Sequence, residues 1–227
     1  MSIPRRFPGE VAIVAGTGPS LTPEVIETCN AARADGKARI FTANRAHEVL
    51  DTDVIHACNW EFYDTYGDRL KDKDCDKWTS HPSLKDSRPD WLLWIEGRWE
   101  PGLSKDPNYI HYHHGSGPQL VNIAYLYGCH RLILVGWDMR YPGKLDNSNK
   151  NYAGPRHFFA DPGYPPGEDV LTVTHWSKTD DSGKKFGLIR EMETIHPADY
   201  GIEIINATPG SAMECFPMAD LESCLEL

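Results

Sequence analysis

The chain has 227 residues, of which 40% are hydrophobic and 25% charged, and its formal net charge is −10. These values are ordinary for one globular domain with a sizeable core, and the negative charge excludes a general polyanion binder while leaving a local basic groove open. The six cysteines form no Cys-x-x-Cys pair, which argues against a zinc ribbon or a thioredoxin-like site. The first residues lack the apolar run of a signal peptide, and no stretch approaches the ~20 apolar residues of a membrane span. We therefore expect a reduced, cytoplasmic protein.

The pattern along the chain predicts alternating strands and helices. Short apolar runs are typical of buried strands, and the segments between them carry helix signals. Thr22 is suited to cap the first helix because Pro23 occupies the first helical position, and Gly128 is suited to end a later one. The expected elements are a strand over Val11–Ala15, a helix over Pro23–Ala34, a strand over Arg39–Ala43, a short helix over 45–50, strands over 53–58, 91–95 and 109–114, a helix over 118–127, a strand over 131–136, a helix over 181–195, a strand over 201–206 and a short helix over 218–224.

Two stretches depart from this alternation. Residues 60–109 are rich in Trp, Asp, Lys and Pro, and we expect an elaboration beside the sheet whose tryptophans pack in a core or stack on a sugar or base. Residues 141–174 hold several prolines and are expected to form a lid loop. The sequence therefore predicts a single nucleotide-binding α/β domain over 1–227, with a Rossmann-like, mostly parallel sheet, helices on both faces and an inserted lid and aromatic region.

Three of the predicted strands end in glycine or asparagine. In a parallel sheet these carboxyl ends lie along one edge, where ligands bind. Gly16-Thr17-Gly18-Pro19-Ser20 follows the first strand, and such a loop either contacts a phosphate or is a simple strand–helix turn. It is not Gly-x-Gly-x-x-Gly, and it lacks the lysine of a P-loop. Asn44 and Asn59 follow the next two strands and can either contact a base, ribose or sugar hydroxyl or cap a turn.

Two further sets of polar residues lie at the start of a predicted helix or just after a predicted strand. Ser116-Gly117 precedes a helix and can offer free amides and a hydroxyl to a ligand, although Ser116 can equally be a helix cap. Asp138 follows the strongest strand signal and can bind a hydroxyl or a metal, or cap a turn. Arg140 and Tyr141 come directly after it, a combination suited to holding a leaving phosphate.

The histidines give two candidate sites. His175, followed by Ser177 and Lys178, can act as a general base, although it is one of ten histidines. His111 and His113 would share one face of a strand, with His114 beside them, but no third carboxylate or cysteine ligand is evident. We therefore predict no metal site.

Taken together and in this order, the motifs resemble those of the bacterial lipooligosaccharide sialyltransferases and of a wider group of sialyltransferase-like Rossmann proteins. The resemblance covers most of the predicted sheet. It is carried by residues 11–21, Asn44, Asn59, Ser116-Gly117, residues 132–138, His175-Trp-Ser-Lys178 and residues 206–211.

The resemblance implies a metal-independent glycosyltransferase that needs no cofactor. It would take a sugar from a nucleotide-activated donor, such as a CMP-sugar, to an acceptor hydroxyl on a saccharide, a protein or a modified nucleobase. The implied donor-binding residues are Gly16, Thr17, Gly18, Ser20, Asn44, Asn59, Ser116, Gly117 and Asp138. The implied catalytic residues are His175 as general base and Arg140, Tyr141 and Tyr152 at the leaving phosphate. Thr17 replaces an asparagine of the family and Arg140 a tyrosine, so the identity of the donor stays open.

Two other functions stay open. The wider group includes proteins that resemble archaeal-type dihydropterin pyrophosphokinases, and in that case Asp138 would hold Mg²⁺ for diphosphate transfer from a nucleoside triphosphate. A protein that binds nucleotides without catalysis can have the same fold. A homo-oligomer is compatible with each of the three.

Overall fold

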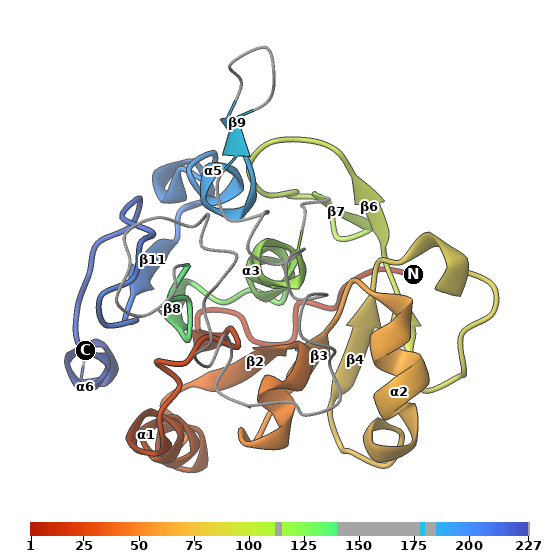
Figure 1. Cartoon of the computed structure of the whole chain (residues 1–227), viewed down its shortest axis with the longest axis horizontal. Coiled ribbons are helices and arrows are strands. Elements are labelled where there is room, and N and C mark those ends of the chain that lie inside the picture. Colours follow the sequence, from red (N-terminus) through yellow and green to blue (C-terminus); the bar gives the residue numbers. More distant parts are fainter. Residues whose placement is uncertain (112–114, 140–177, 180–184, 227) are drawn as a thin grey trace, which may run out of the picture.

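The computed structural model describes residues 1–111, 115–139, 178–179 and 185–226. Within these residues the protein is an α/β fold with a seven-stranded sheet of order β11-β8-β1-β2-β3-β4-β5, and every strand pairing in that sheet is parallel. Helices lie on both sides of the sheet, which confirms the predicted fold class (Figure 1). Among the described residues, no helix combines the length and apolar character that a bilayer span requires.

The elements follow the alternation that the sequence predicts over most of the described chain. In chain order they are β1 (Val11–Ala15), α1 (Pro23–Ala34), β2 (Arg39–Ala43), η1 (Asn44–Glu48), β3 (Val54–His56), α2 (Trp60–Leu70), β4 (Asp76–Thr79), η2 (Pro82–Leu84), β5 (Leu93–Trp94), β6 (Glu96–Arg98), β7 (Tyr109–His111), α3 (Ser116–Leu126), β8 (Arg131–Val135), β9 (Lys178–Thr179), β10 (Lys185–Phe186), α5 (Leu188–Met192), η3 (Pro197–Tyr200), β11 (Glu203–Asn206) and α6 (Leu221–Leu225).

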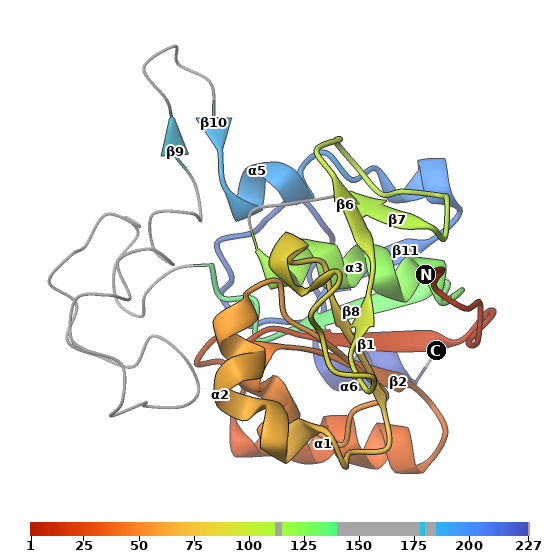
Figure 2. The same cartoon turned by 90° about the vertical axis from the view of Figure 1, so that its right-hand side faces the viewer.

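Two apolar layers enclose the central strands. Side chains alternate across a strand, so Ala12 and Val14 of β1 belong to the core beneath α3, while Ile13 and Ala15 belong to the core beneath α1 and α6. Figures 1 and 2 show α1 and α2 on one side of the sheet and α3 on the other. Both faces of the central strands are buried, which explains why these strands are nearly continuous apolar runs.

The order of the strands reverses at β1. The chain proceeds from β1 outward through β2, β3, β4 and β5, and then returns to form β8 on the opposite side of β1. In open parallel sheets, ligands bind outside the carboxyl ends of the strands at such a reversal point. A ligand site is therefore expected at the residues that follow β1 and β8.

The structure corrects the expectation for residues 60–109. This stretch contains α2, and it adds β4 and β5 to the main sheet rather than lying wholly beside it. The sequence of β4 is Asp-Lys-Trp-Thr, in which only Trp78 is strongly apolar, yet Lys77, Trp78 and Thr79 are all buried. A strand that buries polar side chains lacks the apolar run that reveals the other strands.

One predicted boundary is wrong, and another is described only in part. Of the strand expected over 109–114, Tyr109–His111 form β7, which pairs with β6 in a separate two-stranded sheet, and 112–114 lie outside the described residues. The helix expected over 181–195 is much shorter, because Lys185–Phe186 form β10 and α5 spans only Leu188–Met192. Gly187 lies between them with φ of +111°, a backbone conformation that a helix cannot continue through.

Candidate functional site

The carboxyl edge of the sheet brings together residues from three separate segments. Asn44 follows β2, Cys58 and Asn59 follow β3, and Ser116 opens α3. Asn44 has φ of +48°, in the left-handed region that asparagine tolerates better than most side chains. The predicted convergence of Asn44, Asn59 and Ser116 is therefore present in the structure, and these residues together with Cys58 are termed the carboxyl-edge cluster.

Ser116 is the centre of the carboxyl-edge cluster. Its Oγ accepts a hydrogen bond from the Cys58 backbone N–H at 3.0 Å. The same oxygen lies 3.2 Å from Asn44 Oδ1 and 3.3 Å from Cys58 Sγ. The Cys58 thiol in turn lies 3.3 Å from Asn59 Oδ1. One hydroxyl thus joins the ends of β2 and β3 to the first turn of α3.

Cys58 is the residue of this cluster that the sequence did not single out. Burial raises the pKa of its thiol, although the Ser116 hydrogen bond opposes the shift. A neutral thiol is a poor nucleophile, so the geometry assigns Cys58 to the wall of the site rather than to covalent chemistry. Its place directly before Asn59 at a strand end was the available signal.

Among the described residues, no side chain caps the first turn of α2 or of α3, the two helices that begin beside the cluster. Gly115 precedes α3 and offers no side chain, and Asn59 precedes α2 without making a capping hydrogen bond. The amide groups of a first helical turn carry partial positive charge and attract anions. The carboxyl-edge cluster therefore lies between two helix N-termini that favour negative charge.

The Gly16–Ser20 loop is closed by Asp138. The Asp138 carboxylate accepts hydrogen bonds from Ser20 Oγ at 2.7 Å and from the Ser20 backbone N–H at 3.2 Å. The amides of Gly16 and Gly18 donate to carbonyl groups at the end of β8 and just after it. The Asp138 carboxylate therefore lies against the Ser20 amide, an arrangement that favours the strand–helix turn over the phosphate contact, the two roles that the sequence left open.

The close approach of the two loops requires glycine at position 18. A Cβ at Gly18 would lie 1.8 Å from Asp138 Oδ2 and 2.7 Å from the Gly136 carbonyl oxygen. Gly117 is similarly restricted, since a Cβ there would lie 2.8 Å from the Trp137 ring. Gly18 and Gly117 are therefore needed for close packing against the residues that follow β8, in addition to any room that they leave for a ligand.

Gly18→Ala is expected to lower the free energy of unfolding by about 1–3 kcal/mol, because its methyl group must displace Asp138. In the double variant with Asp138→Ala, at least about 1 kcal/mol of this loss should disappear, which urea unfolding can measure. Gly16→Ala is the control, because its Cβ would meet the Gly136 backbone oxygen at 2.5 Å and Asp138→Ala cannot relieve that contact. If the losses of unfolding free energy in Gly18→Ala and Asp138→Ala simply add in the double variant, the contact between this loop and Asp138 is contradicted.

A buried polar network lies beneath the carboxyl-edge cluster. His56 Nδ1 is 3.0 Å from the Trp78 carbonyl oxygen, and His56 Nε2 is 2.9 Å from Gln119 Oε1. Ser80 Oγ donates to the same Gln119 oxygen at 2.5 Å. His56 is fully buried, and burial lowers its pKa to about 4 even though both hydrogen bonds oppose the shift. A neutral ring carries one N–H and so donates to one of these two oxygens at a time, and the network that it joins links β3, β4 and α3 one turn from Ser116.

Several predicted residues lie outside the described residues. These are the candidate catalytic residues His175, Arg140, Tyr141 and Tyr152, the expected lid over 141–174, and His113 and His114. Of the histidine cluster, His111 is described, with its Nδ1 2.9 Å from the Pro101 carbonyl oxygen and its Nε2 3.5 Å from Glu100 Oε2. Among the described residues, no group of three or more His, Cys, Asp or Glu side chains is arranged to hold a metal ion.

Neither the models of known protein families nor the sequences of curated proteins give a match to this chain.

Proposed function

We propose that the protein is a glycosyltransferase that binds a nucleotide-activated sugar at the carboxyl-edge cluster and transfers the sugar to an acceptor hydroxyl. The single observation that carries this proposal is the convergence of Asn44 and Cys58 on Ser116 at the N-terminus of α3, with Asn59 in contact with the Cys58 thiol. Amide and hydroxyl side chains supply both donors and acceptors, which suits a base, a ribose or a sugar. The cluster also lies on the strand edge where ligands of parallel α/β sheets bind.

The structure supports a changed assignment for the donor phosphate. The closed Gly16–Ser20 loop presents the Asp138 carboxylate, which would repel a phosphate but can accept a hydrogen bond from a sugar or ribose hydroxyl. The first turns of α2 and α3, which no described side chain caps, are better suited to the phosphate. Trp60 opens α2 next to Asn59 with 43% of its surface exposed, and its ring can stack on the base.

The proposed transfer is a single displacement at the anomeric carbon. The acceptor oxygen forms the new bond to this carbon, its proton passes to His175, and the bond to the nucleotide phosphate breaks with its electrons on the leaving oxygen. Arg140, Tyr141 and Tyr152 then stabilise the phosphate charge. This mechanism requires no metal ion.

The experiment combines turnover with two matched pairs of variants. With a panel of CMP-, UDP- and GDP-sugars, His175→Ala should reduce transfer or donor hydrolysis by about 10²–10⁴-fold, whereas His130→Ala at an exposed position should not. Ser116→Ala should weaken donor binding by about tenfold through the loss of one or two hydrogen bonds, whereas Ser87→Ala at an exposed position should leave it unchanged.

Three results would contradict the proposal. Activity of His175→Ala within a few-fold of the wild type would show that His175 is not the general base. Activity with a nucleoside triphosphate that chelator abolishes and Mg²⁺ restores would indicate a phosphotransferase instead. Tight nucleotide binding without turnover on any nucleotide sugar would indicate a binding protein.

A further inference from the structure

A second polar hollow lies at the opposite, amino edge of the sheet. It is a cavity of about 480 Å³ lined by Arg6, Phe7, Arg33, Arg39, Asp53, Lys73, Asp74, Cys75, Asp76 and Lys77. Arg39 and Asp76 are the first residues of β2 and β4, and Asp53 directly precedes β3. The cavity is thus built on the strand ends farthest from the carboxyl-edge cluster.

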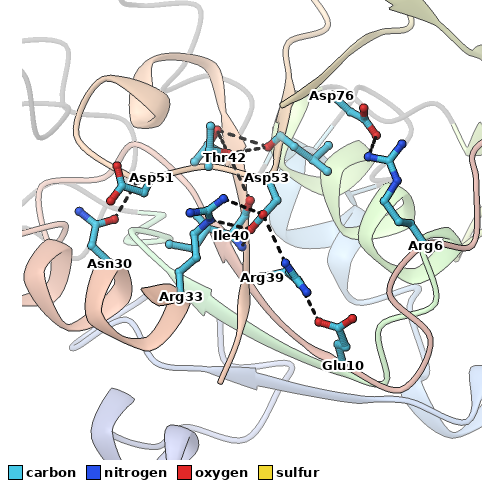
Figure 3. Close-up of polar contacts among 12 residues, drawn as sticks. Arg6, Glu10, Asn30, Arg33, Arg39, Ile40, Thr42, Asp51, Asp53 and Asp76 are labelled. Carbon is cyan, nitrogen blue, oxygen red and sulfur yellow. Dashed lines mark hydrogen bonds and ion pairs between the residues drawn. The ribbon is translucent and has the colours of Figure 1, made fainter. Parts of the chain in front are cut away.

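Three arginines converge on this cavity from different elements (Figure 3). Arg33, in the last turn of α1, binds the Asp53 carboxylate with two hydrogen bonds of 3.0 Å. Arg39 Nε donates to Glu10 at 2.6 Å, and Arg6 Nη1 contacts Asp76 Oδ2 at 2.9 Å. Arg39 also lies over the Phe7 ring, 4.8 Å from its centroid. A guanidinium has five N–H donors, so these contacts use only part of what Arg6 and Arg39 can donate.

Two lysines add positive charge that no carboxylate balances. Lys77 is only 4% exposed, and its ammonium group donates to the backbone carbonyl oxygens of Lys73 and Cys75. Lys73 Nζ donates to the His47 carbonyl oxygen at 2.8 Å. In the part of the chain that the structure describes, neither ammonium group has an ion pair. A buried ammonium group without a carboxylate partner is costly unless an anion approaches it.

The charges around the cavity do not cancel. Its lining contains five basic residues and three acidic ones, and Glu10, which binds Arg39, brings the carboxylates to four, in a chain whose formal net charge is −10. Excess positive charge inside a concave surface raises the local concentration of small anions. Arginine donors arranged beside lysine point charges are the usual partners of phosphoryl oxygens.

We propose that the amino-edge cavity binds a phosphoryl group, either inorganic phosphate or diphosphate or the phosphate of a small ester. The oxygens would take the N–H donors of Arg6 and Arg39 that protein carboxylates leave open, and the negative charge would be balanced by Lys73 and Lys77. This site is separate from the proposed donor site, and the two proposals can fail independently.

Calorimetric titration with pyrophosphate at constant ionic strength tests the site. The double variant Arg6→Gln/Lys73→Gln should bind at least tenfold more weakly than the wild type. The control Lys71→Gln/Arg190→Gln removes the same charge from exposed residues and should bind like the wild type. Equal binding of pyrophosphate by all three proteins would overturn the proposal.

A labelling measurement on the wild type makes the test independent of variant folding. Cys75 lines the cavity, whereas Cys58 lies at the other edge of the sheet. Pyrophosphate should slow alkylation of Cys75 at least several-fold and leave Cys58 unaffected. Equal protection of both cysteines, or of neither, would overturn the proposal. Parallel titrations with inorganic phosphate and with glycerol 3-phosphate distinguish a free phosphate from a phosphate ester, and binding of neither these nor pyrophosphate would also overturn it.

Discussion

Acidification from pH 7 to pH 4.5 is expected to lower the free energy of unfolding by about 5 kcal/mol through two buried histidines. His47 and His56 are 1% and 0% exposed, and burial lowers the pKa of each from 6.5 to about 4. At pH values between about 4 and 6.5, His47 and His56 each bind a proton in the unfolded chain but not in the folded protein. The stability is therefore fully present above pH 6.5, declines as the pH falls, and stops declining through these groups below about pH 4.

His47 makes the stronger test because neither of its buried ring nitrogens has a hydrogen-bond partner among the described residues. The ring packs edge-to-face against Phe62, with 5.8 Å between the ring centroids. His47→Leu should raise the free energy of unfolding at pH 7 by about 1–3 kcal/mol, since it removes unsatisfied polar atoms from an apolar site. His47→Leu should also halve the loss of unfolding free energy between pH 7 and pH 4.5, because only His56 then contributes to it.

Urea unfolding, followed by tryptophan fluorescence at a series of pH values, measures both effects. His196→Gln is the control because His196 is exposed, and this variant should keep the pH dependence of the wild type. The same slope for His47→Leu and the wild type would show that His47 is not a source of the acid sensitivity.

Trp78→Ala is expected to cost about 3–5 kcal/mol of stability. Trp78 is 1% exposed in the middle of β4, and its Nε1 donates to the Tyr127 hydroxyl at 2.8 Å. Its carbonyl oxygen accepts a hydrogen bond of 2.6 Å from Tyr63. Removal of the indole therefore leaves a large cavity between β4 and α3 and a buried hydroxyl with one partner fewer.

Trp99→Ala is the matched control for this prediction. Trp99 is 65% exposed, so its loss should change the stability by no more than about 0.5 kcal/mol. Equilibrium denaturation of both variants gives the comparison. Similar small losses in the two would mean that residues 60–109 are not part of the main core.

The parts of the fold that could be predicted are those that carry an apolar run or a strong local signal. Val11–Ala15 and Arg39–Ala43 are strands with the expected bounds, and Thr22 accepts the capping hydrogen bond from Val25 that its position suggested. The strand β4 could not be found in this way, because burial of Lys77 depends on carbonyl groups in a neighbouring loop. Local sequence does not contain that tertiary information.

The candidate site could likewise be predicted only in part from the sequence. Asn44, Asn59 and Ser116 could be expected to approach one another because parallel strands end at one edge. The closure of Asp138 onto Ser20 could not, because it joins loops 118 residues apart and depends on the close approach of β1 and β8. The buried pairing of His56 with Gln119 is likewise a contact between distant segments, 63 residues apart.

Protection of Cys58 from alkylation tests the central claim most directly, because this thiol lies within the carboxyl-edge cluster. Because burial makes the Cys58 thiol slow to react, the wild-type protein is treated with N-ethylmaleimide until Cys58 is labelled in the free protein, and the labelling rate of each cysteine is then compared with and without each nucleotide sugar. A bound donor should slow labelling of Cys58 at least tenfold while exposed Cys215 reacts at an unchanged rate. A donor that binds by calorimetry yet leaves Cys58 as reactive as in the free protein would contradict the location of the site.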